Sequence, residues 1–266
     1  MAGDARTVVG GAGVTTLTTV IPTRGFAPLV RVCLDRLAAA IARAETAAPL
    51  RATTVVVDNG TPHPLALLAS DATPVRVLRF DRHHSFAACC NAGVAAAPAE
   101  RILLLNNDVL LDPGALADML AAIADAPTVG ICGTRLVFPD GRLQHGGVRF
   151  APTLGPYHDG RGRDADAFPR APRTLQAVTG ACMLVRGEVW SALGGLDEAY
   201  PFGLEDVDFC LRAGRAGWSV RCVQTTDSLH FEAMTPGRRE LDEPSRRLFM
   251  ERWQGRYAID GEDPHD

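Results

Sequence analysis

Short β-rich runs alternate with Ala- and Leu-rich helical stretches through the first half of the chain, and this alternation most constrains its fold. Runs of β-branched and apolar residues predict strands at 17–23, 52–60, 75–80 and 101–109. Apolar residues three and four apart predict helices at 28–44, 85–97 and 113–125. Strands that alternate with helices form a mostly parallel sheet with helices on both faces, so we expect an α/β domain.

The alternation of predicted strands and helices ends at about residue 128. The run "VGICGTRLVF", a "PDG" turn and "QHGGVRF" predict a hairpin, and therefore a small antiparallel element, followed by a loop over 151–174. Further on, the sequence predicts a strand at 175–185, a short helix, a helix that opens with acidic residues, and a last amphipathic helix at 244–258. No internal repeat or long linker divides the chain, so we expect one domain over residues 1–266.

Composition limits the classes of function. A chain of 266 residues with 47% hydrophobic residues can bury a large core, and a net charge of -4 does not fit a nucleic-acid binder. No apolar run reaches the roughly 18 residues of a membrane span, and the first residues lack the pattern of a signal peptide. Seven cysteines without a CxxC pair favour neither disulfides nor structural zinc. We expect a soluble, cytoplasmic protein.

Polar residues follow three of the predicted strands directly. They are Pro22-Thr23-Arg24, Asp58-Asn59-Gly60 and Asn106-Asn107-Asp108. Each group alone is typical of a turn or a helix cap. Ligands of open α/β sheets bind at the carboxyl ends of the strands, so three such groups at one edge favour a binding site. Asp108 supplies a hard oxygen ligand of the kind that Mg²⁺ or Mn²⁺ prefers.

Three carboxylates, Glu205, Asp206 and Asp208, open the acidic helix. The simplest explanation is electrostatic, because acidic side chains near a helix N-terminus each stabilise it by roughly 0.3–1 kcal/mol. The alternative is that one of them is a catalytic base on a rigid mount, with Gly203 before it allowing an unusual and close backbone approach.

The block 179–218, "TGACMLVRGEVWSALGGLDEAYPFGLEDVDFCLRAGRAGW", is the most specific motif. Together with "VIPTR", "VVVDNGT", "SFAACCNAG", "LLLNNDV" and "LHFEAMT", it resembles the inverting family 2 glycosyltransferases of the GT-A fold, notably the rhamnosyltransferase-like members. The resemblance runs from about Leu17 to Trp253. It implies a Rossmann-like central sheet, a nucleotide-binding half at about 15–127 and an acceptor and catalytic half at about 128–260.

The resemblance also implies an activity. Such an enzyme moves a sugar, here rhamnose or another hexose, from a nucleotide-diphosphate sugar to an acceptor hydroxyl, with inversion and with Mn²⁺ or Mg²⁺. The acceptor is a glycan, a lipid-linked sugar, a peptide or a natural product. A position at the membrane periphery and a homodimer are both compatible with this reading.

Roles follow from the resemblance residue by residue. Asp58 matches a carboxylate that contacts the nucleotide base or ribose. Asn106 and Asp108 match the ends of the DxD motif, so Asn106 makes a neutral contact and Asp108 ligates the metal, with His230 completing its shell. Asp206 matches the catalytic base. The remaining candidates are Pro22, Thr23, Arg24, Asn91 and Asn107 for the nucleotide sugar, Glu205 for catalysis, and Thr179, Gly180 and Asp208 for support or the acceptor.

Two other functions stay open at this point. A sugar-phosphate nucleotidyltransferase would need a Gly-rich basic loop after the first strand, which "IPTRGFAPL" matches poorly. A non-catalytic binding protein would have no use for a base at Asp206. The sequence also departs from the family at His83-His84, where we expect a solvated loop, and we expect Trp218 and Trp253 to pack in the core.

Overall fold

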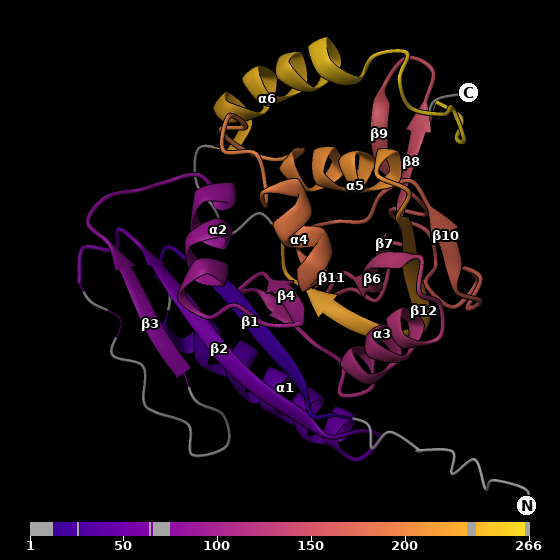
Figure 1. The fold of residues 1–266 in the computed structure, drawn as a ribbon. Coiled ribbons are helices and arrows are strands. Elements are labelled where there is room, and N and C mark those ends of the chain that lie inside the picture. Colours follow the sequence, from indigo (N-terminus) through magenta and orange to yellow (C-terminus); the bar gives the residue numbers. More distant parts are fainter. Residues whose placement is uncertain (1–12, 26, 64, 66–74, 233–237, 264–266) are drawn as a thin grey trace, which may run out of the picture.

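A single mixed sheet between two layers of helices organises the computed structural model, which describes residues 13–25, 27–63, 65, 75–232 and 238–263 (Figure 1). The expectation about a signal peptide concerns residues almost entirely outside these ranges. The main path of the sheet has the order β10-β12-β6-β11-β4-β1-β2-β3. The strands are β1 (Thr15–Thr23), β2 (Leu50–Asn59), β3 (Val75–Phe80), β4 (Arg101–Leu105), β5 (Val109–Leu110), β6 (Val129–Val137), β7 (Leu143–His145), β8 (Val148–Ala151), β9 (Gly155–His158), β10 (Arg173–Leu175), β11 (Cys182–Arg186) and β12 (Ser219–His230). The helices are α1 (Ala27–Glu45), α2 (Phe86–Ala96), α3 (Ala115–Ala124), α4 (Gly187–Leu193), α5 (Glu205–Arg215) and α6 (Arg238–Trp253).

The first half forms the parallel sheet that the sequence predicts. Strand β1 pairs in parallel with both β2 and β4, and β2 pairs in parallel with β3. One boundary is wrong, because the predicted strand at 101–109 is two strands. The backbone leaves the sheet at Asn106–Asp108, and β5 then pairs antiparallel with β12. The polar trio therefore forms a turn at the carboxyl end of β4.

The second half confirms the antiparallel hairpin of β6 and β7 but adds strands that the sequence did not predict. Strand β9 lies within the expected loop and forms a separate small sheet with β8. The expected strand at 175–185 is reduced to β11, and the residues before it are irregular. Strand β12 was missed, although it is 12 residues long and lies between β10 and β6, because "SVRCVQTTDSLH" lacks alternation of apolar and polar residues.

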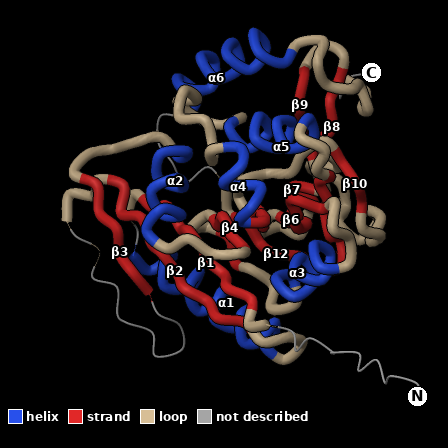
Figure 2. The backbone as a smooth tube through the Cα atoms, viewed as in Figure 1, coloured by secondary structure: helices blue, strands red, loops and turns tan. Residues whose placement is uncertain are grey.

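Two apolar cores lie on opposite faces of the sheet, and successive residues of its strands alternate between them, as Val56 and Val57 do. Helices α1 and α3 cover one face, while α2, α4, α5 and α6 cover the other (Figure 2). Trp253 of α6 is 4% exposed within the second of these layers, which confirms its packing role. Neither helical layer covers the carboxyl ends of the parallel strands, and these ends line a cavity.

All seven cysteines are buried, and none is in a disulfide. Among the helices in the described ranges, none combines the length and the apolar character needed to cross a bilayer.

Gly93 allows α2 to pack closely against β1. An added Cβ would lie 2.3 Å from Cγ1 of Val20, which is itself fully buried. We therefore predict that Gly93→Ala lowers the free energy of unfolding by about 1–3 kcal/mol, as overpacked cores do. The measurement is urea denaturation. Gly214→Ala in α5 is the control, because open space surrounds that position and alanine favours helix; equal stability of both variants would contradict the prediction.

Candidate active site

A cavity of about 560 Å³ opens where the parallel strands end. Its walls come from the ends of β1 and β2, the turn between β4 and β5, the segment before β11, the N-terminus of α5 and the end of β12. The structure brings most of the predicted site residues to this one cavity: Pro22, Thr23, Arg24, Asn106, Asn107, Asp108, Thr179, Gly180, Glu205, Asp206 and His230. The arrangement follows from the sheet, since parallel strands present their carboxyl ends on the same side.

Asp206 is held in place by two backbone N–H groups. Gly180 donates to its Oδ2 at 2.7 Å, and Val207 donates to its Oδ1 at 2.8 Å. Burial raises the pKa of Asp206, while these hydrogen bonds oppose the shift by stabilising the ionised form. The carboxylate therefore keeps a fixed position and a raised affinity for a proton, which are properties of a general base.

Glycine is needed beside Asp206 at a different position from the one expected. An added Cβ at Gly180 would lie 3.1 Å from the Cβ of Asp206, so the close approach occurs there. Gly203 has open space around it, so the expected close approach at that residue is wrong. What is unusual at Gly203 is its positive φ of 73°. The next residue, Leu204, also has a positive φ, of 69°. These two residues turn the chain into α5.

Glu205 is 5% exposed and lies in the same wall, yet its Oε2 has no hydrogen-bond partner among the described residues. Burial, and then the charge of Asp206, raise the pKa of Glu205. Two adjacent carboxyl groups, one buried and one half-buried, bind protons as a pair, since ionising both is unfavourable. Because Asp206 accepts the two backbone N–H bonds, we assign the negative charge to Asp206 and the proton to Glu205.

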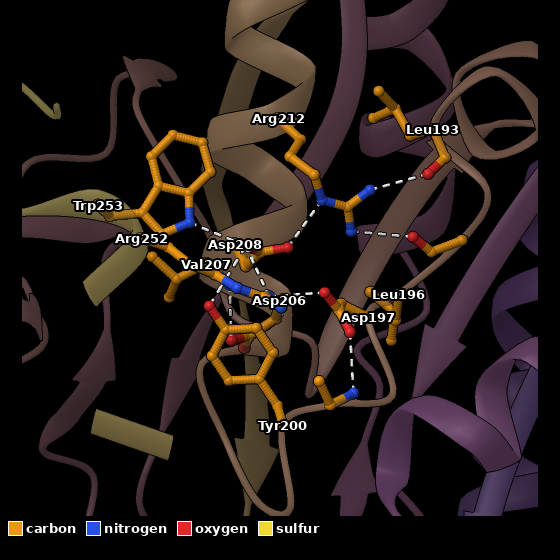
Figure 3. Close-up of polar contacts among 12 residues, drawn as sticks. Leu193, Leu196, Asp197, Tyr200, Asp206, Val207, Asp208, Arg212, Arg252 and Trp253 are labelled. Atoms are coloured by element: carbon orange, nitrogen blue, oxygen red, sulfur yellow. Dashed lines mark hydrogen bonds and ion pairs between the residues drawn. The ribbon is translucent and has the colours of Figure 1, made fainter. Parts of the chain in front are cut away.

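Asp208 does not line the cavity. It anchors helix α5 through a group of polar contacts (Figure 3). Its Oδ1 accepts from Trp253 Nε1 at 2.8 Å and from the Tyr200 hydroxyl at 3.3 Å, and its Oδ2 accepts from Arg212 Nε at 2.7 Å. This carboxylate is 2% exposed and already surrounded by donors. The expectation that Asp208 contacts the acceptor is therefore corrected: it joins α5 to α6 and to the preceding loop.

Asp108 and His230 meet at one side of the cavity, with Oδ1 of the aspartate 3.1 Å from Nε2 of the histidine. Nδ1 of His230 lies 2.7 Å from Gln144 Oε1, and the amide group of Gln144 donates to Glu232 at 3.1 Å. This chain of contacts assigns the proton of a neutral His230 to Nδ1. Its Nε2 then faces Asp108 with a lone pair, so two electron-pair donors approach one point from two elements.

That point suits a divalent cation, because carboxylate oxygen and imidazole nitrogen are both ligands for Mn²⁺ and the Gln144 contact orients the imidazole. In the described part of the chain, no cluster of three or more His, Cys, Asp or Glu side chains is placed to hold a metal. A cation here would therefore have two protein ligands, which leaves coordination positions for substrate oxygens.

The wall of the cavity between the end of β1 and the β4–β5 turn is polar, and hydrogen bonds hold its side chains in place. Asn107 Nδ2 donates to Thr23 Oγ1 at 3.0 Å, and Asn106 donates its backbone N–H to Ala181 at 2.8 Å. Arg24 is the one arginine among the described residues that line the cavity. It supplies positive charge on the side where Thr23 and the asparagines supply neutral donors and acceptors.

Two predicted contacts do not reach the cavity. Asp58 is fully buried, with its carboxylate 2.7 Å from Arg79 Nη1 and accepting the Thr61 N–H. The amide group of Asn91 donates to the carbonyl of Leu196 and to Glu198, and its oxygen accepts the N–H of Leu196. Both side chains use their polar atoms within the protein, so their places in this structure correct the expected substrate contacts to structural ones.

Sequence reasoning missed several residues of the cavity wall. Gln144, His158 and Glu232 line it, and so do His83 and His84, for which we expected only a solvated loop. The available signal was in "QHGGVRF", because a polar pair within a strand next to apolar residues needs partners once it is buried. Gln144 is 3% exposed.

Glu205→Gln tests the protonation of the acidic pair. With its pKa raised, native Glu205 keeps a proton that the unfolded chain releases above the usual glutamate pKa of about 4.3, so wild-type stability declines as the pH rises above that value. Glutamine does not titrate, so the variant lacks this pH-dependent decline in stability. We predict that the melting temperature of the variant, relative to wild type, increases between about pH 5 and pH 8.

Glu188→Gln on α4 is the matched control, because the side chain of Glu188 is 63% exposed. Scanning calorimetry across the pH range measures both differences. A constant offset for Glu205→Gln would show that Glu205 is ionised throughout.

Comparison with known proteins adds the following findings. The family model for Glycosyl transferase family 2 matches residues 18–192. The chain is 32% identical over 223 residues to the O-antigen biosynthesis protein RfbC of Myxococcus xanthus, covering 80% of this chain and 17% of that protein. It is 32% identical over 165 residues to the N-acetylglucosaminyl-diphospho-decaprenol L-rhamnosyltransferase of Mycobacterium tuberculosis, covering 55% of this chain and 52% of the relative. The chain thus spans about half or less of the length of these relatives.

Solved structures share the fold at low sequence identity. The GalNAc-T7 structure with UDP, GalNAc and Mn²⁺ has a TM-score of 0.63 at 13% identity, covering 90% of this chain and 48% of that one. The mannosyltransferase PcManGT from Pyrobaculum calidifontis, in complex with GDP-Man and Mn²⁺, has a TM-score of 0.62 at 14% identity, covering 95% and 67%. These neighbours confirm the expected GT-A fold.

Proposed function

Because the chain belongs to glycosyl transferase family 2, we propose that it transfers a sugar from a nucleotide-diphosphate sugar to a hydroxyl group of an acceptor, with inversion at the anomeric carbon. One observation carries this proposal: the Asp108–His230 pair and the carboxylate of Asp206 line the same cavity. Transfer needs a site for the leaving diphosphate and a base for the attacking hydroxyl, and these residues offer both.

Asp206 serves as the base. The acceptor hydroxyl oxygen attacks the anomeric carbon while its proton passes to Asp206, and the bond from that carbon to the diphosphate oxygen breaks with its electrons on the leaving group. The N–H groups of Gly180 and Val207 keep the carboxylate aimed during this transfer. One base opposite the leaving group supports a single displacement, for which no second nucleophilic carboxylate is needed.

Asp108 and His230 would hold a divalent cation, Mn²⁺ or Mg²⁺. When bound, such an ion neutralises the charge that develops on the departing diphosphate. The 3.1 Å contact of Nε2 with Asp108, with Nδ1 turned to Gln144, supports this assignment, as does the presence of Mn²⁺ in the structures of GalNAc-T7 and PcManGT. Arg24, Thr23 and the two asparagines of the β4–β5 turn would contact the nucleotide side of the donor.

The relatives support a substrate class. The name of the Mycobacterium tuberculosis relative describes an L-rhamnosyltransferase acting on N-acetylglucosaminyl-diphospho-decaprenol. We therefore propose rhamnose or another hexose as the sugar and a saccharide, including a lipid-linked one, as the acceptor. A lipid-linked acceptor would bring the protein to the membrane periphery from the cytoplasmic side. The alternative of a nucleotidyltransferase has less support, because neither the family match nor the loop after β1 favours it.

Asp206→Asn tests the base. We predict that turnover falls by about 10²–10⁴-fold, the range that a positioned base contributes, with little change in the affinity for the nucleoside diphosphate. The measurement is release of nucleoside diphosphate from a panel of UDP-, GDP- and dTDP-sugars, with calorimetric titration for affinity. Asp140→Asn is the control, because Asp140 pairs with Arg142 in the turn between β6 and β7 and does not line the cavity. Retained turnover in Asp206→Asn would refute the assignment.

The cation site gives a second prediction. Mn²⁺ should increase the thermal stabilisation that UDP or GDP confers, because the ion joins the diphosphate to Asp108 and His230; a ligand at 100 times its Kd contributes roughly 2.7 kcal/mol. Asp108→Asn and His230→Gln should each abolish the Mn²⁺-dependent part. Asp125→Asn, an exposed change at the end of α3, should leave it intact. An Mn²⁺ effect that persists in both site variants would contradict the assignment.

A further inference from the structure

Two basic side chains on the cavity wall carry an inference that rests on the proposed function and deepens it. Arg24 lies in the loop after β1, and His83 lies in the loop between β3 and α2. Both line the cavity, and both are exposed to solvent. The two groups are near enough for the charge of Arg24 to act on the imidazole of His83. A cavity thus contains two basic groups from two loops, and we call them the Arg24–His83 pair.

The loop that carries His83 is fixed to the end of β2. The amide group of Asn59 donates to the carbonyl of His84 at 2.9 Å, and the oxygen of that amide accepts the N–H of His84 at 2.8 Å. Gly60 follows, where an added Cβ would lie 2.5 Å from the carbonyl carbon of Arg82 and 2.8 Å from the nitrogen of His83. The backbone on both sides of His83 therefore lies against the sheet, so the loop is positioned instead of merely solvated.

The charge state of His83 depends on what enters the cavity. Burial, followed by the charges of Arg24 and His84, lowers the pKa of His83 below the ordinary value for an imidazole. In the ligand-free protein, the neutral form of His83 is therefore favoured over a wider pH range than in a free peptide. An anion beside Arg24 and His83 would reverse this effect, because a nearby negative charge favours the imidazolium.

Neighbouring groups of the described chain leave that negative charge to a ligand. His84 is a second imidazole, and Arg82 is an exposed cation. Asp81 is exposed and is not among the groups whose charge shifts the pKa of His83. Asp58, at the end of β2, is fully buried in an ion pair. The first turn of α2, which follows the loop, contains no acidic residue.

Hydrogen bonds along the wall connect the pair to the proposed cation site. Arg24 directly follows Thr23, whose hydroxyl accepts from Nδ2 of Asn107 at 3.0 Å. Asn107 in turn directly precedes Asp108. The Arg24–His83 pair and the cation ligand therefore lie at two ends of one stretch of wall. A diphosphate has two adjacent phosphate groups, so one could bind the cation while the other binds the pair.

We propose that Arg24 and His83 together bind the diphosphate of the sugar nucleotide, Arg24 as a permanent cation and His83 as a hydrogen-bond donor that takes up a proton when the ligand binds. A ligand that prefers the protonated imidazole is bound more tightly where that form is populated. Because the unperturbed imidazole titrates at about pH 6.5, the contribution of His83 to affinity should increase as the pH falls from about 8 to about 6.

Calorimetric titration with the panel of UDP-, GDP- and dTDP-sugars in the presence of Mn²⁺ tests the pair. Sugar nucleotides are the probe because they lack the terminal phosphate that titrates near pH 6 in a nucleoside diphosphate. We expect wild type to bind its sugar nucleotide roughly five- to tenfold more tightly than His83→Gln at pH 6, as for a charge-assisted hydrogen bond, and within about twofold at pH 8. The ratio of wild type to variant removes the titration of the cation ligands, which both proteins share.

Two further variants separate charge from structure. His83→Lys keeps a positive charge at both pH values, so it should bind more tightly than His83→Gln at pH 8 as well as at pH 6. His63→Gln is the control and should match wild type, because His63 is exposed and lies outside the cavity wall. Melting temperatures show whether each variant is folded.

Two readouts measure the proton on His83 directly. Titrations in buffers of different ionisation enthalpy count the protons taken up on binding, and wild type should take up more of them at pH 7 than His83→Gln does. NMR of the ligand-free protein, with the signals of His83 identified by their loss in His83→Gln, should show that Arg24→Gln raises the pKa of His83, because a positive charge is removed.

The outcomes separate this inference from the proposed function. Equal affinity of wild type and folded His83→Gln at pH 6 overturns the inference alone, and so does a loss of affinity that is the same at pH 6 and pH 8. Equal proton uptake, or a pKa of His83 that Arg24→Gln leaves unchanged, also overturns it. A wild-type protein that binds no member of the panel with Mn²⁺ overturns the proposed function, and the role of the Arg24–His83 pair with it.

Discussion

The backbone of the three-residue segment Thr179–Ala181 contacts three parts of the cavity wall. The N–H of Gly180 holds the carboxylate of Asp206 at 2.7 Å, and the carbonyl of Ala181 accepts the N–H of Asn106 at 2.8 Å. The N–H of Thr179 meets His145. One short stretch of backbone thus contacts helix α5 at Asp206, the turn that carries Asp108, and His145 of β7. Such a stretch cannot be a regular strand, because its donors and acceptors are aimed at the site instead of at neighbouring strands.

Rigidity of the base depends on a second layer of contacts. Asp208 fixes α5 from behind through Trp253, Tyr200 and Arg212, so the helix N-terminus cannot shift without breaking buried charge-assisted hydrogen bonds (Figure 3). Leu204 has a backbone conformation that costs an L-residue about 1–3 kcal/mol, and this anchoring allows it to persist. The strained turn and the anchored helix together place two carboxyl groups in the cavity wall.

Sequence reasoning succeeded where local pattern and global fold agree. The parallel strands and the polar groups at their ends were predictable, because β-branched runs and sheet topology fix both. It failed at β12, whose polar side chains Gln224, Thr225 and Ser228 pair with neighbouring elements, and at Asp58 and Asn91. A sequence shows that such a side chain is polar, but not whether Arg79 or the backbone of Leu196 already pairs with it. The wall residues Gln144 and His158 come from strands that only the tertiary pairing brings to the site.

The proton on Glu205, which burial and the charge of Asp206 favour, also limits the negative charge of the cavity. In the proposed function, a diphosphate would enter a cavity whose described wall already contains Asp108, Asp206 and Glu232, against one arginine. Every further negative charge would repel the donor in a site where burial weakens screening. Protonation of Glu205 removes one such charge, and a cation held by Asp108 and His230 would offset another. Since such a cation would have two protein ligands among the described residues, its affinity would depend on the diphosphate, so the two ligands should favour each other's binding by the same factor.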